Sequence, residues 1–278
     1  MQTQEAFPRL SAEEYIENQS DVWVKNRTVK NRFSLHCHDF FEIEIILRGR
    51  GTHVFNGISY PIEAGCSYLI KPTDIHEIVA DGELEICNIV FRETMISETV
   101  LFSVLQSDLS CCIRLTGREL DSMIMAARIL ANECKGGGNY RSGMLEYLIH
   151  FFTGDTGKTQ ASGEISGIKR ALLYLEVHFR EQIDLSVLAK EAGFHPMYFS
   201  AVFKKTTGES YVQRLTSLRL AYAATLLKNN CSVSYACFES GFGSLSNFFT
   251  AFKKKYGVSP KEYVRGKKKP AENNVRCP

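Results

Sequence analysis

The chain has 278 residues, of which 44% are hydrophobic, and this length favours two ordinary domains over one. The net charge of +2 conceals an asymmetry, because residues 1–163 carry 15 basic and 22 acidic side chains, whereas residues 164–278 carry 18 and 9. This distribution argues against a polyanion partner for the first half and favours DNA as a partner of the second.

The cysteines and the apolar runs give no sign of export or membrane insertion. The nine cysteines are odd in number and lack the CxxC spacing of zinc modules and redox sites. Glu5, Glu13 and Glu14 stand where a signal peptide needs an apolar stretch, and no apolar run reaches membrane-spanning length. We therefore expect a cytoplasmic protein without membrane contact.

Short β-strands are predicted between residues 21 and 92, because runs of apolar or alternating residues are separated there by turn signals. The predicted strands cover residues 23–24, 41–47, 52–55, 68–70 and 84–91. Asn56-Gly57 is the strongest turn signal, since this dipeptide tolerates the positive φ angles of a two-residue hairpin. Short strands joined by hairpins predict a sandwich or barrel.

A helical hairpin is predicted next, because apolar residues recur every three or four positions after residue 117 and again after the glycines at 136–138. It either packs only on its own barrel or also presents a stripe to a second subunit, so a homodimer is an expectation. Residues 153–166 are mostly small or polar, which predicts a flexible linker. The charge balance changes there, and we place the domain boundary at this segment.

The second half contains an internal repeat with an offset of 48 to 49 residues. Each copy predicts a short helix (185–192; 233–240), a Gly-Phe turn and a longer helix (196–206; 245–256). Each copy is therefore a candidate helix-turn-helix, whose second helix can enter the DNA major groove. An amphipathic helix at 211–228 is expected to connect the copies and to fix their spacing.

Three motifs stand in this half: Arg219-Leu220-x-x-Ala223-x-x-Leu226-Leu227, Gly241-Phe242-x-Ser244-x-Ser246-x-Phe248-x-x-x-Phe252-Lys253 and Gly257-Val258-Ser259-Pro260-x-x-Tyr263. Through them, residues 168–264 resemble the DNA-binding domain of the AraC/XylS family of bacterial transcription regulators. The resemblance implies a seven-helix domain whose two longer helices enter adjacent segments of the major groove.

By position, the resemblance implies a set of residues that face the bases. They are His195, Pro196, Met197, Ser200 and Ala201 in the first copy and Leu245, Ser246, Asn247 and Thr250 in the second. The nearby lysines are expected to contact phosphates: Lys204, Lys205, Lys253, Lys254 and Lys255. The phenylalanines at helical spacing are expected in the core: Phe194, Phe199, Phe203, Phe242, Phe248 and Phe252.

The first half is similar to the cupin-type sensor barrel of the same family, through His36-x-His38-Asp39-Phe40-Phe41-Glu42 and Gly65-x6-Pro72-x-Asp74-x-His76. On one strand, the even-numbered members from His36 to Glu44 would share a polar face that points into the barrel. A polar interior predicts an effector pocket. The expected pocket residues are Trp23, His36, His38, Glu42, Glu44, Tyr68 and His76.

A metal site is the alternative to an effector pocket in the same barrel. His36, His38, Glu42 and His76 reproduce the spacing by which enzymatic cupins hold a divalent ion. Against this alternative, Ala80 stands where the fuller cupin motif has Asn, and regulators of the family keep the histidines while they bind organic effectors. We therefore expect an organic effector and no cofactor.

These observations predict an α+β protein with a cupin-like effector-binding and dimerisation domain at 1–152, a linker at 153–166, a double helix-turn-helix domain at 167–266 and a basic tail at 267–278. The predicted function is a sequence-specific transcription activator controlled by a small polar effector such as a sugar. Its expected partners are double-stranded DNA, a second copy of the chain and RNA polymerase. The alternatives are a metal-dependent cupin enzyme with a helical appendage and a nonspecific architectural DNA-binding protein.

Overall fold

The computed structural model describes residues 8–16, 21–72, 74–106, 112–136, 138–153 and 167–266. These residues divide into two units, one running from residue 8 to 153 and the other from 167 to 266. The predicted linker, apart from Thr153, and the predicted basic tail lie outside the described residues.

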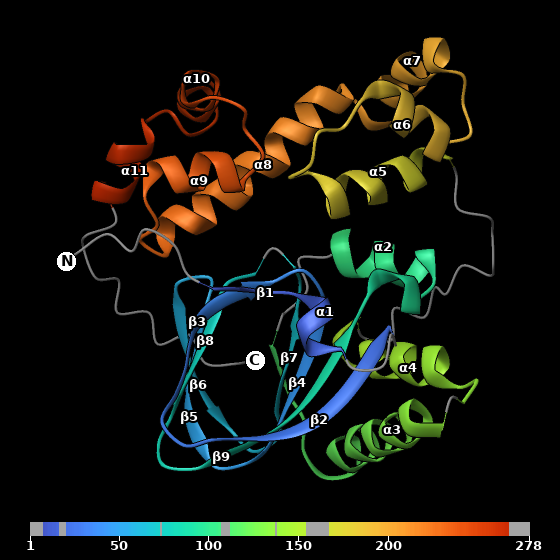
Figure 1. Cartoon of the computed structure of the whole chain (residues 1–278), viewed down its shortest axis with the longest axis vertical. Coiled ribbons are helices and arrows are strands. Elements are labelled where there is room, and N and C mark those ends of the chain that lie inside the picture. Colours follow the sequence, from blue (N-terminus) through green and yellow to red (C-terminus); the bar gives the residue numbers. More distant parts are fainter. Residues whose placement is uncertain are drawn as a thin grey trace. The chain divides into compact units, whose positions relative to one another are not determined.

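The first unit is built mainly of short strands (Figure 1). They are β1 (Arg9–Leu10), β2 (Val22–Val29), β3 (Arg32–His38), β4 (Phe41–Arg48), β5 (Arg50–Phe55), β6 (Ile58–Glu63), β7 (Cys66–Ile70), β8 (His76–Ala80), β9 (Leu84–Phe91) and β10 (Cys112–Arg114). Within the described residues they form two sheets, with the orders β1-β3-β8-β5-β6 and β10-β7-β4-β9-β2. The predicted strand-rich domain is confirmed. The structure extends the strand expected around His36 and His38 back to Arg32, and it adds strands at 9–10, 76–80 and 112–114 that were not predicted.

The hairpin between β5 and β6 follows the predicted turn. Asn56 and Gly57 have φ angles of 50° and 80°, and Phe55 pairs with Ile58 across the turn. The Asn56 side-chain amide donates to the Asp74 carboxylate at 2.8 Å, and the same carboxylate accepts the Lys71 backbone N–H at 2.8 Å. The turn therefore holds the loop that leads into β8, and this loop fixes the start of the strand that carries His76.

The first unit also contains helices, some between its strands and two after the last strand. They are α1 (Ala12–Tyr15), the 3-10 turn η1 (Glu93–Met95), α2 (Glu98–Gln106), α3 (Gly117–Gly136) and α4 (Arg141–Thr153). The predicted hairpin is confirmed as α3 and α4, which pack against each other, and α3 also packs against β2. Its buried stripe contains Met123, Ala127 and Leu130, three of the residues whose spacing predicted a helix. α2 was not predicted.

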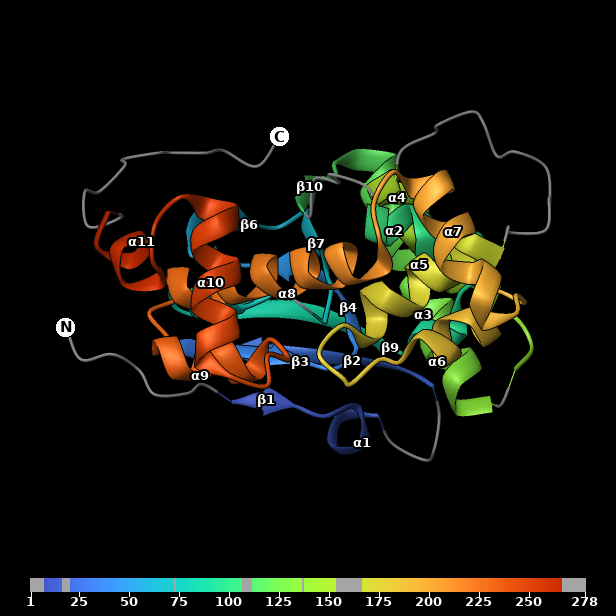
Figure 2. The same ribbon diagram turned by 90° about the horizontal axis from the view of Figure 1, so that it is seen from above.

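The second unit contains seven helices between residues 167 and 266, as expected. They are α5 (Gly167–His178), α6 (Leu185–Glu191), α7 (Pro196–Thr207), α8 (Tyr211–Lys228), α9 (Val233–Glu239), α10 (Leu245–Tyr256) and α11 (Pro260–Gly266). Figures 1 and 2 show α8 running from α5, α6 and α7 to α9, α10 and α11. None of the described helices is both long and apolar enough to cross a bilayer.

The connector helix α8 begins at a capping box, in which the Ser210 hydroxyl accepts the Gln213 backbone N–H and the Gln213 side chain accepts the Ser210 backbone N–H. Its buried residues include Leu215, Leu220 and Leu226. Arg219 donates from this helix to the carbonyls of Phe179 and Glu181, both at 2.7 Å. The connector is thereby fixed to the segment that follows α5.

Candidate functional site

Each helix-turn-helix has a glycine with positive φ in its turn, Gly193 at 70° and Gly241 at 88°. The second helix of each pair then begins at a side-chain cap. His195 Nδ1 accepts the Met197 backbone N–H at 3.4 Å before α7, and the Ser244 hydroxyl accepts the Asn247 N–H at 3.4 Å before α10. The His195 ring therefore has a capping role in addition to the base contact predicted for it.

The two longer helices bury one face and expose the other. Phe199, Phe203, Phe248 and Phe252 are fully buried, as predicted, whereas Phe194 is 36% exposed and is not a core residue. Pro196 is half-buried and the other predicted DNA-contacting residues are exposed: His195, Met197, Ser200, Ala201, Lys204, Leu245, Ser246, Asn247, Thr250 and Lys253. Tyr198 is 69% exposed beside Met197 and was missed, because sequence spacing alone does not distinguish it from its neighbours.

Two side chains of α10 are already engaged within the unit. The Thr250 hydroxyl donates to the Ser246 carbonyl at 3.0 Å. Lys255 Nζ donates to the Ser217 carbonyl at 2.9 Å and to the Ser217 hydroxyl at 2.7 Å. The Lys255 ammonium therefore ties α10 to α8, and its contact with a phosphate stays a prediction. Lys253 and Lys254 stay exposed in the same turn.

The histidines and carboxylates singled out in the first half meet at the centre of the barrel. His36 and His38 lie on β3, Glu42 and Glu44 on β4 and His76 on β8, and each is at most 4% exposed. The expectation that His36 to Glu44 share one strand is wrong, because Asp39 and Phe40 separate two strands that belong to different sheets. The side chains meet across the barrel and not along one strand.

The shortest separations in this cluster converge on one carboxylate. His38 Nε2 lies 3.4 Å and His76 Nε2 3.6 Å from Glu42 Oε2. The other oxygen, Glu42 Oε1, accepts a hydrogen bond from the Asn88 side chain at 2.5 Å. Two overlapping groups have ligand atoms close enough to hold a metal ion: His36, Glu42 and His76, and Glu44, His53 and His76.

Burial disfavours charge on the imidazoles. It lowers the pKa of His36 to about 4 and the pKa of His53 to about 3. Burial also lowers the pKa of His76, and it raises the pKa of Glu44, to which the nearby Glu42 carboxylate adds. His36, His53 and His76 are therefore neutral near pH 7, the form in which an imidazole can ligate a metal or accept a hydrogen bond.

Two predicted pocket residues have different surroundings. The Tyr68 ring is fully buried and lies edge-on to His53, with ring centroids 4.1 Å apart. Trp23 is partly exposed and packs in an apolar cluster with Phe40 and Val90. His53 and Asn88 were missed. The sequence contained one indication of His53, because it alternates with Gly51 and Phe55. All three lie on the buried face of β5.

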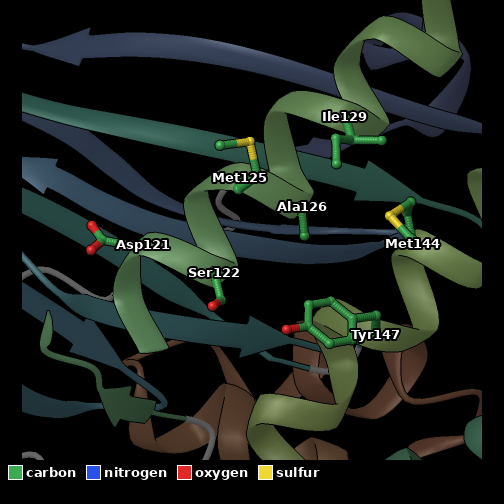
Figure 3. A pocket seen from close by; sticks show the side chains of 7 residues that line it. All are labelled: Asp121, Ser122, Met125, Ala126, Ile129, Met144 and Tyr147. Atoms are coloured by element: carbon green, nitrogen blue, oxygen red, sulfur yellow. The ribbon is translucent and has the colours of Figure 1, made fainter. Parts of the chain in front are cut away.

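An open groove of about 470 Å³ lies between α3 and α4 (Figure 3). Its lining is mostly apolar, and several of its side chains are exposed. The lining residues are Asp121, Ser122, Met125, Ala126, Ile129, Met144 and Tyr147. Ala126 in this lining also belongs to the buried residues of α3, together with Met123 and Leu130.

Two family models match this chain and together cover more than half of it. The AraC-like ligand binding domain matches residues 24–121, and the helix-turn-helix domain matches residues 188–266. The chain belongs to the AraC family of transcription regulators. It is accordingly a DNA-binding transcription regulator, with the barrel in the position of the family's ligand-binding domain.

Relatives of similar length carry both halves. The chain is 26% identical over 260 residues to the HTH-type transcriptional activator RhaR of Mannheimia succiniciproducens, a match that covers 90% of this chain and 93% of that protein. It is 26% identical over 261 residues to the HTH-type transcriptional activator RhaS of Yersinia pestis, with coverages of 89% and 95%.

Similar solved structures include an apo single-residue variant of ToxT from Vibrio cholerae, at 18% identity, a TM-score of 0.37 and coverages of 90% of this chain and 98% of that one. The C-terminal domain of AraT, a response regulator from Geobacillus stearothermophilus, is 29% identical, with a TM-score of 0.35 and coverages of 39% and 94%.

Proposed function

We propose that the protein is a cytoplasmic transcription activator, controlled by a small polar effector such as a sugar that binds in the barrel, and that it is not an enzyme. The observation that carries this proposal is the buried set of polar side chains inside the domain that matches the AraC-like ligand binding domain. Relatives that match over both halves are named activators. The proposed effector contacts are His36, His38, Glu42, Glu44, Tyr68 and His76. Trp23, which is partly exposed, is the remaining proposed contact.

DNA recognition is assigned to the exposed faces of α7 and α10. The lysines on these faces, Lys204 and Lys253, would set the register on the phosphates, and the first-turn residues would read base edges. Effector binding can change transcription only if it favours one arrangement of the DNA-binding units over another. RNA polymerase is the proposed downstream partner.

A homodimer through α3 and α4 is part of the proposal. Met125, Ile129 and Tyr147 are exposed apolar side chains around the groove. An antiparallel pairing of two α3 helices centred on Met125 would place Asp121 of one copy near Arg128 of the other, and both residues are exposed. If so, Ile129→Glu should lower the mass in light scattering to that of a monomer, whereas an unchanged mass would exclude this surface.

The effector proposal is tested by a thermal-shift screen of the full chain with sugars, sugar acids and amino acids. A ligand at about 100 times its dissociation constant stabilises the folded state by about 2.7 kcal/mol, which is readily detected. A hit should then change the protection of promoter DNA in footprinting. Catalytic conversion of the hit, detected by following its concentration, would favour the enzyme alternative.

A further inference from the structure

Four buried side chains bring their inner atoms together at the centre of the barrel. His36, Glu42 and His76 each place one ligand atom within 4.8 Å of the others. His38 Nε2 lies 3.4 Å from Glu42 Oε2 and is the fourth candidate ligand, although it is not within 4.8 Å of all the other three ligand atoms. The centre is closed to solvent, since His38 and His76 are 0% exposed.

The outer nitrogens of two of these rings are held by backbone carbonyls. His36 Nδ1 donates to the Ser34 carbonyl at 2.8 Å, and His38 Nδ1 donates to the Phe40 carbonyl at 2.7 Å. Because a carbonyl oxygen can only accept, Nδ1 carries the hydrogen in both rings. In the neutral form of such a ring, Nε2 presents a lone pair, and this is the form that ligates a metal.

The other two side chains have their own outer partners. His76 Nδ1 lies 3.2 Å from His53 Nε2, and Asn88 donates to Glu42 Oε1. A hydrogen bond from His76 Nδ1 to His53 leaves the Nε2 of His76 with a lone pair, and the bond from Asn88 orients Oε2 of Glu42 inward. Outer-shell partners of this kind fix the orientation of metal-ligating side chains.

Hydrogen bonding within the cluster does not satisfy the inner atoms. Among the described residues, Nε2 of His38 and Nε2 of His76 have no hydrogen-bond partner. Their distances to Glu42 Oε2, 3.4 and 3.6 Å, exceed the roughly 2.7–2.9 Å of a charge-assisted hydrogen bond. An ion with bonds of about 2.1 Å separates tetrahedral ligand atoms by about 3.4 Å, which matches both distances.

We propose that the barrel binds one divalent transition-metal ion through His36, His38, Glu42 and His76, with His53 and Asn88 as positioning residues. Three imidazoles and one carboxylate suit zinc, iron, manganese or nickel. These four residues are also among the proposed effector contacts, so an effector in the barrel would meet them as ligands of the ion. Metal binding itself does not depend on the identity of that effector. The competing group of Glu44, His53 and His76 shares only His76 with it.

The test uses full-length protein without a polyhistidine tag, stripped with a chelator and titrated with Zn²⁺ or Mn²⁺ alone by calorimetry. We expect one saturable site per chain, a rise in melting temperature and an X-ray absorption spectrum with three imidazole ligands. Absence of saturable binding of both ions would overturn the proposal, even if the protein still responds to an organic effector and still binds DNA.

Near-isosteric variants distinguish the two groups of ligands. His38→Gln and Glu42→Gln should weaken the metal affinity by more than about 100-fold, whereas Glu44→Gln should weaken it less than about tenfold. If Glu44→Gln weakened the metal affinity more than His38→Gln and Glu42→Gln do, the ion would bind to the competing group and the assignment would be overturned. Far-ultraviolet circular dichroism of the metal-free variants shows that each is folded, and X-ray absorption of the folded His38→Gln protein at saturating zinc should report one imidazole fewer.

The positioning role of His53 is tested by a pair of substitutions. His53→Phe keeps the ring volume but removes the acceptor for His76 Nδ1, and it should weaken metal affinity by about 10- to 100-fold without changing the number of imidazole ligands. His53→Gln restores an acceptor and should recover part of the affinity. Loss of one imidazole ligand in His53→Phe would show that His53 binds the ion directly.

Discussion

Ala201 and Thr250 occupy exposed positions on the proposed recognition helices α7 and α10, and neither is an arginine, the usual bidentate reader of guanine. We expect Ala201→Arg or Thr250→Arg to shift preference toward guanine at one operator position by about 1–3 kcal/mol, the effect of one bidentate pair. Binding to a panel of single-base operator variants measures the shift. Lys254→Arg is the matched control, because a guanidinium at a phosphate-contacting position should leave base preference unchanged.

The unaltered recognition helices present few groups that read guanine. Met197, Ala201 and Leu245 are apolar and exposed, and their natural partner is the thymine methyl group. Asn247 can pair bidentately with adenine. We therefore predict that selection from randomised DNA yields half-sites rich in A·T, with a strong salt dependence from the lysines. Half-sites dominated by guanine would show that other residues face the bases.

The residues of the barrel centre were only partly accessible from the sequence. His36, His38, Glu42 and His76 could be selected because their spacing forms a motif, although their meeting across two sheets could not be inferred from alternation along one strand. His53 belongs to no motif, and its contact with His76 depends on the pairing of β5 with β8. Such a pairing joins segments distant in sequence, and local patterns do not encode it.

At the scale of single elements, the equivalent turn glycines of the two helix-turn-helix units differ in their surroundings. A Cβ added at Gly241 would lie 2.7 Å from the Arg180 carbonyl oxygen and 2.9 Å from its Cα, whereas one at Gly193 would meet only the end of the Arg170 side chain at 3.6 Å. Gly193→Ala should therefore cost about 1 kcal/mol, from positive φ alone. Gly241→Ala should lower the stability by about 2–4 kcal/mol in total, because its Cβ would also be overpacked against the backbone of Arg180.

Urea unfolding of the full-length protein, followed by the helical signal, measures this difference, with each variant compared with the unaltered protein. Equal losses of stability would mean that the backbone near Arg180 relaxes around the new methyl group.

Elements with local signals were predicted well. The Asn56-Gly57 hairpin, the pair α3 and α4 and the repeated helices at 185–256 each follow from turn residues or from apolar spacing. α2 was missed. A strand was expected around His36 and His38, but its start at Arg32 was not predicted, although polar and apolar residues alternate from Arg32 to His38. Most helical stability in proteins comes from tertiary packing, which local patterns do not report.

At the scale of the whole molecule, the separation into two units predicts that a fragment of residues 164–278 binds operator DNA without effector. All the proposed DNA contacts and most of the basic excess lie in this fragment. Gel-shift titration with specific and scrambled DNA at low salt tests it. No preference for the specific site, in a fragment shown to be helical, would mean that the first unit supplies part of the DNA contact.

The complementary prediction concerns His38→Ala and Glu42→Ala in the full-length protein. Both residues are buried in the barrel, where Glu42 is the carboxylate nearest to His38 and His76, so either change disrupts the polar centre. Since the proposed DNA contacts lie in the other unit, we expect the transcriptional response to the effector to fall while the affinity for operator DNA changes by less than about threefold, or about 0.6 kcal/mol. Reporter transcription with and without effector, together with gel-shift titration of the same proteins, measures both quantities.

Ser59→Ala, an exposed change on β6, is the control. A parallel loss of DNA affinity in folded variants would mean that the state of the barrel determines DNA binding directly.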